Sequence, residues 1–302
     1  MTISFEGRVA IVTGAGGGLG RAYALELAKR GAKVVVNDLG GSRDGAGASD
    51  AAQQVVEEIL KSGGQAIADG SSVTEFDQML ALVARAKETW GGVHVLINNA
   101  GILRDKSFTK MEPADFDLVV KVHLIGSANA TKAVWDLMRE QNYGRILMTA
   151  SSTGLFGNFG QANYGAAKLA LAGLTKTLYL EGAKYNVRVN TLAPVAATRM
   201  TADIFPEEAF KLFGPENVVP AALYLVSEDS PTNAIVGAGA GAFHTSVVTM
   251  NEPVILPPAD CTVEGFAANW DRISDRSTDF VPQSGVEQSQ AILTAMTAAA
   301  KR

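Results

Sequence analysis

The amino-acid sequence predicts an α/β protein with a doubly wound Rossmann fold: a parallel seven-stranded sheet, helices on both faces and a C-terminal helical extension. Two observations predict this class. Short β-branched runs alternate with stretches of helical period, which is the signature of strand, crossover helix and strand. A glycine-rich run also follows the first strand directly. The 302 residues, 47% of them hydrophobic, are enough to bury a large core.

The expected elements alternate regularly over most of the chain. Strands are expected at residues 9–12, 34–36, 93–97, 145–149 and 187–192, and the helices between them include residues 21–30 and 51–61. Each strand is a short apolar run, as in sheets that are buried on both faces. Parallel neighbours joined by helices are therefore expected.

A cluster of prolines that begins with Pro253 ends this alternation. The remainder predicts two helices, at residues 263–273 and 286–299. It has too few apolar residues for a core of its own. We expect residues 1–250 to form one core and residues 251–302 to pack on that core or on a partner subunit.

Composition excludes several kinds of partner. A net charge of −5 and a pI near 5.3 provide no basic field for nucleic acid or an anionic membrane, so a small-molecule substrate is favoured. Cys261 is the only cysteine, so no disulfide can form within the chain, and no metal site is expected. No stretch is long and apolar enough to span a bilayer, and the N-terminus lacks a secretory signal. We expect a cytoplasmic protein.

The glycine-rich run predicts a dinucleotide site. It lies between the first strand and the first helix, where free backbone N–H groups and the helix dipole favour a pyrophosphate. Glycine is needed because a Cβ would block the close approach of the ligand. A flexible turn is the alternative, but the flanking strand and helix favour the dinucleotide. We expect Gly14, Gly18, Leu19 and Gly20 to contact it.

Asp38 predicts the choice of cofactor. It ends the second strand, where a carboxylate accepts hydrogen bonds from the adenosine ribose and repels a 2′-phosphate. NAD is therefore favoured over NADP, although Arg43 lies close enough in sequence to leave NADP open. Residues 40–47 are rich in glycine and are expected to form a surface loop beside the cofactor.

Tyr164 and Lys168 predict acid–base chemistry. Their i, i+4 spacing in a segment of helical period places both side chains on one face. A phenol has a pKa of about 10, and a nearby ammonium favours the phenolate, so Lys168 is expected to lower the pKa of Tyr164. Such spacings also arise by chance, but no other tyrosine of the chain has a lysine four residues later.

Five sequence features together resemble the short-chain dehydrogenase/reductase family. They occur in family order: Thr13-Gly-x-x-x-Gly18-x-Gly20, Asn98-Asn99-Ala100-Gly101, Ser151 thirteen residues before Tyr164, Tyr164-x-x-x-Lys168, and Arg188-Val-Asn190-x-x-Ala-Pro194. The resemblance implies hydride transfer at a secondary alcohol or ketone. It implies that Ser151 bonds the reacting oxygen and Tyr164 exchanges its proton. Lys168 would hold the nicotinamide ribose, and Asn99 would line the cofactor cleft.

His123 stands where the family usually has a catalytic asparagine. A neutral imidazole can both donate and accept, so it could hold the same water relay. Its protonation near neutral pH would then add a pH dependence that an amide lacks. A buried helix histidine without a catalytic role is the alternative.

Three other departures from the family pattern concern the cofactor. Ser71 replaces the usual adenine-binding aspartate, and Ser72 and Val73, which follow it, are expected cofactor contacts. Thr198 stands one residue early and is an expected nicotinamide contact. Gly17 takes the place of a basic residue common in NADP-dependent relatives, which again favours NAD.

Longer segments resemble one group of the family, the (3R)-hydroxyacyl-CoA dehydrogenase part of peroxisomal multifunctional enzymes of type 2, also described as a 17β-hydroxysteroid dehydrogenase. These segments are residues 20–25, 36–41, 98–105, 122–124 and 157–164. The resemblance implies NAD-dependent oxidation of a (3R)-hydroxyacyl-CoA, supplied by a separate enoyl-CoA hydratase. Because the chain ends in Lys301-Arg302 without a peroxisomal signal, a cytosolic enzyme of bacterial type is expected.

Several alternatives stay open. Arg104, Lys106 and Lys110 are candidates for binding the CoA phosphates, or they form a solvated basic loop. The substrate could instead be a hydroxysteroid, a steroid side-chain CoA ester or a 3-oxoacyl carrier. A non-catalytic NAD sensor is disfavoured, because it would need the glycines and Asp38 but no proton donor such as Tyr164. The resemblance also implies a homodimer or homotetramer.

Overall fold

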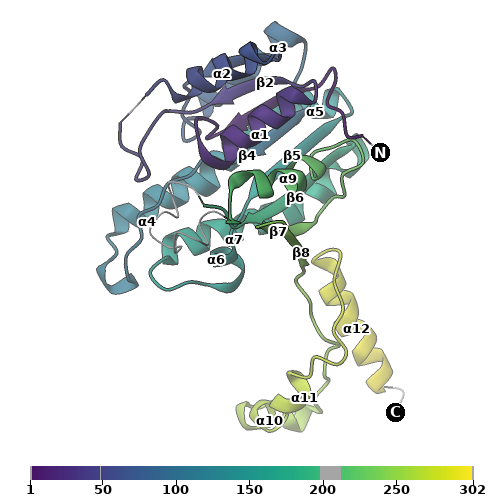
Figure 1. Ribbon diagram of the computed structural model, residues 1–302. Helices are drawn as coiled ribbons and strands as arrows, with labels where there is room; N and C mark the ends of the chain where they lie inside the picture. The colour runs from purple at the N-terminus through teal and green to yellow at the C-terminus, as the bar shows by residue number, and fades with distance from the viewer. Residues whose placement is uncertain (1, 48, 198–211, 301–302) are drawn as a thin grey trace. The chain divides into compact units, whose positions relative to one another are not determined.

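The structure is a computed structural model that describes every residue except 1, 48, 198–211 and 301–302, and in the described part eight strands form one sheet (Figure 1). The strand order is β3-β2-β1-β4-β5-β6-β7-β8. The bounds are β1 Val9–Thr13, β2 Lys33–Asn37, β3 Gln65–Asp69, β4 Val95–Asn98, β5 Gly144–Thr149, β6 Val187–Pro194, β7 Ile235–Gly239 and β8 Ala242–Ser246. Strands β1 to β7 pair in parallel, so the predicted fold class is confirmed.

The sheet has one strand more than the seven expected. Strand β8 follows β7 after only Ala240 and Gly241, a connection so short that the two strands run antiparallel as a hairpin. All but the last of its side chains are exposed, so it lacks the apolar run that marks the other strands in the sequence.

Helices cover both faces of the sheet, as predicted (Figure 1). One face carries α1 Gly18–Lys29, α2 Ala51–Lys61 and α9 Val219–Tyr224, and the other carries α3 Phe76–Trp90, α5 Gly126–Glu140 and α7 Ala162–Gly182. Shorter helices are η1 Phe108–Lys110, α4 Pro113–Val120, the π-helix η2 Lys121–Ile125, α6 Ser152–Phe156, η3 Ala183–Tyr185 and η4 Pro215–Asn217.

Alternate residues of each strand pack on opposite faces. In β1, Ala10 and Val12 join the apolar cluster that includes α1 and α2, whereas Val9 and Ile11 join the cluster that includes α3 and α5. These side chains are at most 2% exposed. Burial on both faces explains why the strand is a continuous apolar run in the sequence.

The direction of winding reverses at β1. From β1 the chain builds β2 and β3 on one side and then returns to place β4 on the other. In doubly wound sheets, the crevice at the carboxyl ends of the strands beside this reversal binds ligands. The glycine-rich run follows β1 and the Asn99 segment follows β4, so both lie at this crevice.

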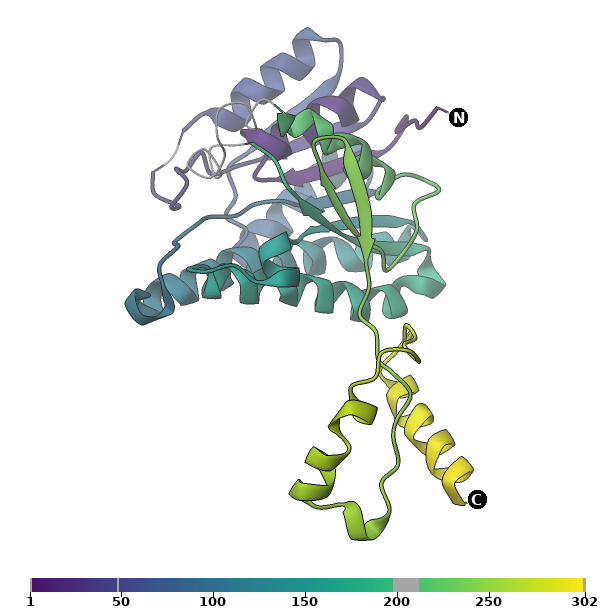
Figure 2. The same ribbon diagram turned by 60° about the horizontal axis from the view of Figure 1, so that its bottom comes forward.

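Residues Ser246–Arg302 form a second compact unit, seen in yellow-green and yellow in Figure 2. It holds η5 Pro258–Asp260, α10 Val263–Ala268, α11 Trp270–Ile273 and α12 Val286–Ala300. The single helix expected at residues 263–273 is divided at Asn269, whose side-chain amide donates to the carbonyl of Gly265 and competes with the helical backbone. No described side chain of this unit is buried.

Arg145 is a fully buried cation near the amino end of β5. Its guanidinium donates hydrogen bonds of 2.8 to 3.1 Å to four backbone carbonyls, those of Gly144, Asn186, Ser227 and Glu228. These bonds connect β5 with the residue before β6 and with the segment that follows α9. A buried charge is tolerated only when its donors are satisfied in this way.

We expect Arg145→Met to lower the free energy of unfolding by about 3 kcal/mol, because four backbone carbonyls, two of them in fully buried hydrogen bonds, lose their donor. Urea unfolding monitored by circular dichroism measures the change. Lys132→Met is the control: this lysine of α5 is 62% exposed in its pair with Asp136, and its loss should cost less than about 1 kcal/mol. Equal effects of the two substitutions would contradict the role given to Arg145.

Candidate active site

A cavity of about 330 Å³ opens at the carboxyl ends of β1, β2 and β4. It is lined by most of the residues expected to contact the cofactor: Gly14, Gly18, Leu19, Asp38, Ser72, Val73 and Asn99. Ser71 and the loop residues Gly41, Ser42, Arg43 and Gly45 also line it. Of the other expected contacts, Gly20, Tyr164 and Lys168 do not line the cavity, and Thr198 lies outside the described residues.

The glycine turn is shaped by close packing as well as by backbone conformation. Gly14 and Gly18 have positive φ angles of 63° and 52°. A Cβ on Gly14 would lie 2.7 Å from the Cα of Ala100, and one on Gly20 would overlap the carbonyl oxygen of Gly14. Helix α1 begins at Gly18, so its N-terminus lies at the cavity wall. These residues therefore fit a dinucleotide pyrophosphate.

Asp38 joins the two loops that flank the cavity. Its Oδ2 accepts a 2.8 Å hydrogen bond from the backbone N–H of Gly16, and its Oδ1 accepts a 2.6 Å bond from that of Gly40. A Cβ on Gly16 would lie 2.9 Å from the Asp38 carboxyl carbon, so glycine is required there. A carboxylate has about four acceptor positions, which leaves capacity for the hydroxyls of a ribose.

Asn99 fixes the position of the glycine turn relative to β4. Its side-chain amide donates 3.0 Å hydrogen bonds to the carbonyls of Thr13 and Gly14. In return, Thr13 Oγ1 accepts from the backbone N–H groups of Asn99 and Ala100, at 3.0 and 3.1 Å. Asn99 is therefore both a turn-forming amide and part of the cavity wall.

Ser151, Tyr164 and Lys168 converge between the end of β5 and α7. Ser151 hydrogen-bonds the phenol of Tyr164, and the Lys168 ammonium lies 5.5 Å from the centre of the Tyr164 ring. Lys168 Nζ also donates to the backbone carbonyl of Thr149. Ser151 and Lys168 are 8% and 3% exposed. The structure thus places Ser151, from the segment that follows β5, against the Tyr164–Lys168 pair that the helical spacing predicts.

Burial dominates the electrostatics of this cluster. It raises the pKa of Tyr164 to about 12, although the hydrogen bond from Ser151 lowers it, and the charge of Asp105 raises it further. Burial also lowers the pKa of Lys168 to about 7. A lysine that is half deprotonated at neutral pH cannot strongly favour a phenolate. The expected lowering of the Tyr164 pKa by Lys168 is therefore not found in this structure.

His123 lies in the π-helix η2, directly against Tyr164. The two rings meet edge to face, with centroids 5.1 Å apart. His123 Nε2 lies 2.8 Å from the carbonyl oxygen of Ile102, and its Nδ1 is buried without a partner among the described residues. Burial lowers the pKa of His123 to about 3, helped by the charge of Lys168 and opposed by the bond to Ile102. The expected protonation near neutral pH is therefore wrong, because burial removes the solvation that a charged imidazole needs.

Gly101 makes the position of His123 possible. A Cβ at residue 101 would overlap the imidazole, so the glycine of the Asn-Asn-Ala-Gly segment provides the space that the ring fills. In the sequence, Gly101 stands out only as the last residue of the Asn-Asn-Ala-Gly segment. The pairing of a glycine here with a larger ring at residue 123 is the signal that could have indicated the contact.

Two buried polar side chains beside Tyr164 were missed. Gln161 donates to Asp105 Oδ2 at 2.7 Å. Asn163 accepts from the backbone N–H of Tyr164 at 2.7 Å and donates to the carbonyl of Arg104 at 3.1 Å. The contacts to Asp105 and Arg104 join segments 56 and 59 residues apart, so no local pattern predicts them.

The basic residues considered for the CoA phosphates are engaged elsewhere. Arg104 and Lys106 both pair with Asp115, at 2.7 and 3.4 Å. Arg104 also donates to the backbone carbonyl of Asp44. Lys110 is exposed. Arg104 and Lys106 therefore do not present free charges in this structure, which favours the solvated basic loop of the two interpretations.

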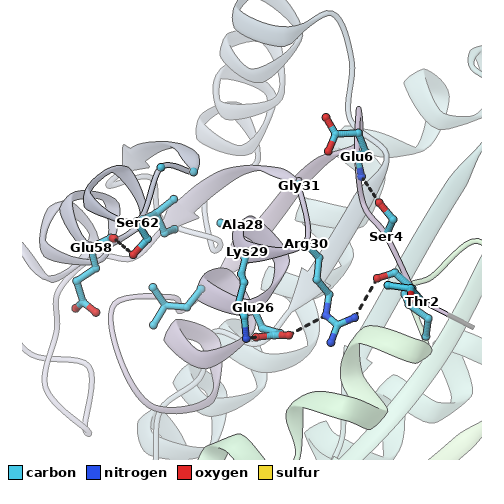
Figure 3. A pocket seen from close by; sticks show the side chains of 15 residues that line it. Thr2, Ser4, Glu6, Glu26, Ala28, Lys29, Arg30, Gly31, Glu58 and Ser62 are labelled. Atoms are coloured by element: carbon cyan, nitrogen blue, oxygen red, sulfur yellow. Dashed lines mark hydrogen bonds and ion pairs between the residues drawn. The ribbon is translucent and has the colours of Figure 1, made fainter.

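A larger cavity, of about 750 Å³, lies at the C-terminal ends of α1 and α2 (Figure 3). These helix ends precede β2 and β3, so this cavity lies at the amino edge of the sheet. Its wall residue Arg30 donates to Glu26 at 2.8 Å and to the carbonyl of Ile3 at 3.0 Å, and Lys29 also pairs with Glu26. Its cations are thus neutralised within the wall, and none of the motif residues lies there.

Comparison with known proteins decides the family. The family model for short chain dehydrogenases matches residues 8–209. The chain belongs to this family. Peroxisomal multifunctional enzyme A of Dictyostelium discoideum is 47% identical over 298 residues, which cover 98% of this chain and 66% of that protein. A putative short-chain type dehydrogenase/reductase of Mycobacterium tuberculosis is 50% identical over 276 residues, 90% of this chain and 96% of that protein.

Solved structures agree with this assignment. The full-length peroxisomal multifunctional enzyme type 2 from Drosophila melanogaster matches with a TM-score of 0.82 and 37% identity, over 98% of this chain and 50% of that one. A 7α-hydroxysteroid dehydrogenase in complex with NADH and 7-oxo glycochenodeoxycholic acid matches with a TM-score of 0.71 and 30% identity, over 79% of this chain and 95% of that one. This chain spans about one third to two thirds of the length of the multifunctional proteins that it matches. It is an oxidoreductase that acts on CH–OH groups, and the resemblance inferred from its sequence is confirmed.

Other expectations are tested less directly. No helix in the described part of the chain is long and apolar enough to cross a membrane. Among the described side chains, no three or more of His, Cys, Asp and Glu gather in a way that could hold a metal ion. The cytoplasmic location stays a prediction, because two of the relatives above are named as peroxisomal.

We expect acid to destabilise the protein through His123. Its pKa is about 3 in the folded chain and 6.5 as a reference value, so the unfolded state binds more protons between these values and stability falls as the pH drops below 6.5. At about pH 5 this histidine should cost about 2 kcal/mol relative to pH 7. Urea unfolding at both pH values measures the loss. His123→Asn should lose about 2 kcal/mol less than the unsubstituted protein, and equal losses would contradict a buried neutral imidazole.

Proposed function

We propose that this protein oxidises a (3R)-hydroxyacyl-CoA to the 3-ketoacyl-CoA, with NAD as the hydride acceptor. The proposal rests on the convergence of Ser151, Tyr164 and Lys168 near a cavity walled by the glycine turn and Asp38, to which Gly101 and His123 connect the phenol. A pure nucleotide sensor would need the cavity but not the buried phenol. Similarity to multifunctional enzymes over 98% of this chain supports a thioester substrate.

Each part of the NAD molecule is assigned to a different group of residues. The pyrophosphate would lie on Gly14, Gly18, Leu19 and Gly20, the adenosine ribose on Asp38, the adenine near Ser72 and Val73, and the nicotinamide half near Asn99, Tyr164, Lys168 and Thr198. When bound, NAD supplies an acceptor for the hydride and a positive charge that favours the phenolate. The carboxylate of Asp38 disfavours a 2′-phosphate, and a relative of similar fold was solved with NADH.

The proton chemistry falls to the buried cluster. Ser151 would donate a hydrogen bond to the substrate oxygen. Once its own proton has left toward Lys168, Tyr164 would take the alcohol proton as the carbinol hydrogen leaves as hydride to NAD. Lys168, with a pKa of about 7, can accept and release a proton near neutral pH, so it suits a relay from the phenol. The unpartnered Nδ1 of neutral His123 could orient a water for the same relay.

The substrate is tested by turnover. Purified protein is mixed with (3R)- or (3S)-hydroxyacyl-CoA or a hydroxysteroid, each with NAD and with NADP, and the reduced cofactor is followed by absorbance. We expect turnover of the (3R)-thioesters with NAD to exceed every other combination. Turnover of hydroxysteroids alone would support the steroid alternative, and no turnover of the (3R)-thioesters would overturn the proposal.

The role of Tyr164 is tested in the same assay. Tyr164→Phe should lower kcat about a thousandfold, since general acid–base groups contribute on this order, and should leave NADH binding by fluorescence within about twofold. Tyr224→Phe is the matched control, because Tyr224 ends α9 and is 46% exposed. Retention of activity by Tyr164→Phe would show that another group moves the proton.

We also propose that the protein is a homodimer or homotetramer. The second unit exposes large apolar side chains, among them Phe266, Trp270 and Leu293, at 49%, 54% and 63%, and it buries none of its described side chains. Such surfaces usually lie in an interface. Light scattering behind a sizing column should give at least twice the mass of 31.6 kDa, and a monomer at micromolar concentration would contradict the proposal.

A further inference from the structure

We propose that Thr153 and Gln161 are positioning residues for the Ser151–Tyr164 pair, and that Asp105 fixes the orientation of the Gln161 amide. The inference rests on the proposed function, because it concerns the residues assigned there to the reacting oxygen. It is carried by hydrogen bonds whose donors and acceptors can each be identified from chemistry.

Asp105 decides which end of the Gln161 amide faces which neighbour. Asp105 Oδ2 lies 2.7 Å from Gln161 Nε2, and an ionised carboxylate only accepts, so the NH₂ group must point to Asp105. The amide oxygen then faces Thr153 and Asn158, at 2.9 and 3.0 Å. Because this oxygen only accepts, the Thr153 hydroxyl must donate to it.

Thr153 connects the oriented Gln161 amide to Ser151 through two hydrogen bonds. Its backbone N–H donates to Ser151 Oγ at 3.2 Å, as the N-cap bond of α6, while its hydroxyl is held by Gln161. With one lone pair of Oγ engaged, the Ser151 hydroxyl can direct its proton to the phenol oxygen of Tyr164, and the hydrogen bond between the two side chains lowers the pKa of the phenol. The serine is therefore oriented by two residues that do not touch the phenol.

Gln161 also connects the helix capped by Ser151 to the helix that carries Tyr164. It is the residue before α7, and its carbonyl accepts from the backbone N–H of Gly165 in the first turn. Ser151, Thr153 and Gln161 are all at most 9% exposed, so water does not readily replace these bonds. A shift of Gln161 therefore moves both partners of the reacting pair.

The charged and titratable groups that face Tyr164 come from three elements. They are Lys168 of α7, His123 of η2 and Asp105 of the segment after β4. Only Asp105 is exposed, and its negative charge opposes the phenolate. It thus orients Gln161 and raises the pKa of Tyr164 at the same time.

Two nearly isosteric substitutions test the assignment. Thr153→Val removes the hydroxyl, and Thr153→Ser retains it. In protein carrying tyrosine labelled with ¹³C at Cζ, the Tyr164 resonance is identified by its loss in Tyr164→Phe, and it reports the hydrogen bond to the phenol without substrate. We expect Thr153→Val to shift this resonance and Thr153→Ser to leave it unchanged. An unshifted resonance in Thr153→Val would overturn the proposal even if the substrate were misassigned.

Kinetics supply the second readout. Thr153→Val should lower kcat about tenfold and leave the KM for NAD within about twofold, whereas Thr153→Ser should keep most of the activity. Asp105→Asn lets the Gln161 amide turn either way and removes a negative charge, so the pH at which kcat/KM rises should move lower. An equal fall in activity in Thr153→Val and Thr153→Ser would contradict the positioning role. A pH profile that does not move in Asp105→Asn would contradict it too, and the residues would then only pack beside the site. If no thioester is turned over, the proposed function fails, and the resonance alone decides the inference.

Discussion

The hydrogen bonds between Thr13 and Asn99 are the constraint on which the site depends. Thr13 Oγ1 accepts from two backbone N–H groups after β4, and the Asn99 amide donates to the carbonyls of Thr13, which ends β1, and Gly14, which follows it. They hold together the carboxyl ends of the two strands at which the winding of the sheet reverses. The glycine turn, the cavity wall and the start of α1 are all positioned from this junction.

Desolvation explains most of the chemistry of the reacting cluster. A charge that is brought out of water must find a partner or shift its pKa, and the buried side chains beside Tyr164 do the latter. Lys168 approaches neutrality and His123 is neutral, so the cluster carries little fixed charge before the cofactor arrives. The sequence suggested that an ammonium beside the phenol would dominate. That interpretation neglected the cost of burying the ammonium itself.

Local patterns predicted what is local in the structure. The glycine turn and the Tyr164–Lys168 spacing each depend on residues that are close together in the sequence, and both have the expected geometry. Strand β8 and the break at Asn269 were missed, because one has exposed side chains and the other depends on a side chain that competes with its own helix. The π-helix around His123 was missed as well, since an extra residue in a helical turn leaves no clear period. Contacts such as Gln161 with Asp105 depend on the tertiary fold.

The segment after β4 links the two halves of the site. On one side, its Leu103 N–H donates to the carbonyl of Arg43, and Arg104 donates to the carbonyl of Asp44, so it holds the loop that walls the cofactor cavity. On the other side, the Arg104 carbonyl accepts from Asn163, which in turn accepts from the backbone of Tyr164. Four hydrogen bonds therefore connect the loop at the cavity with the backbone of Tyr164. The short stretch of chain that the sequence marks only as Asn-Asn-Ala-Gly and its basic continuation therefore contacts both the loop at the cavity and the helix that carries Tyr164.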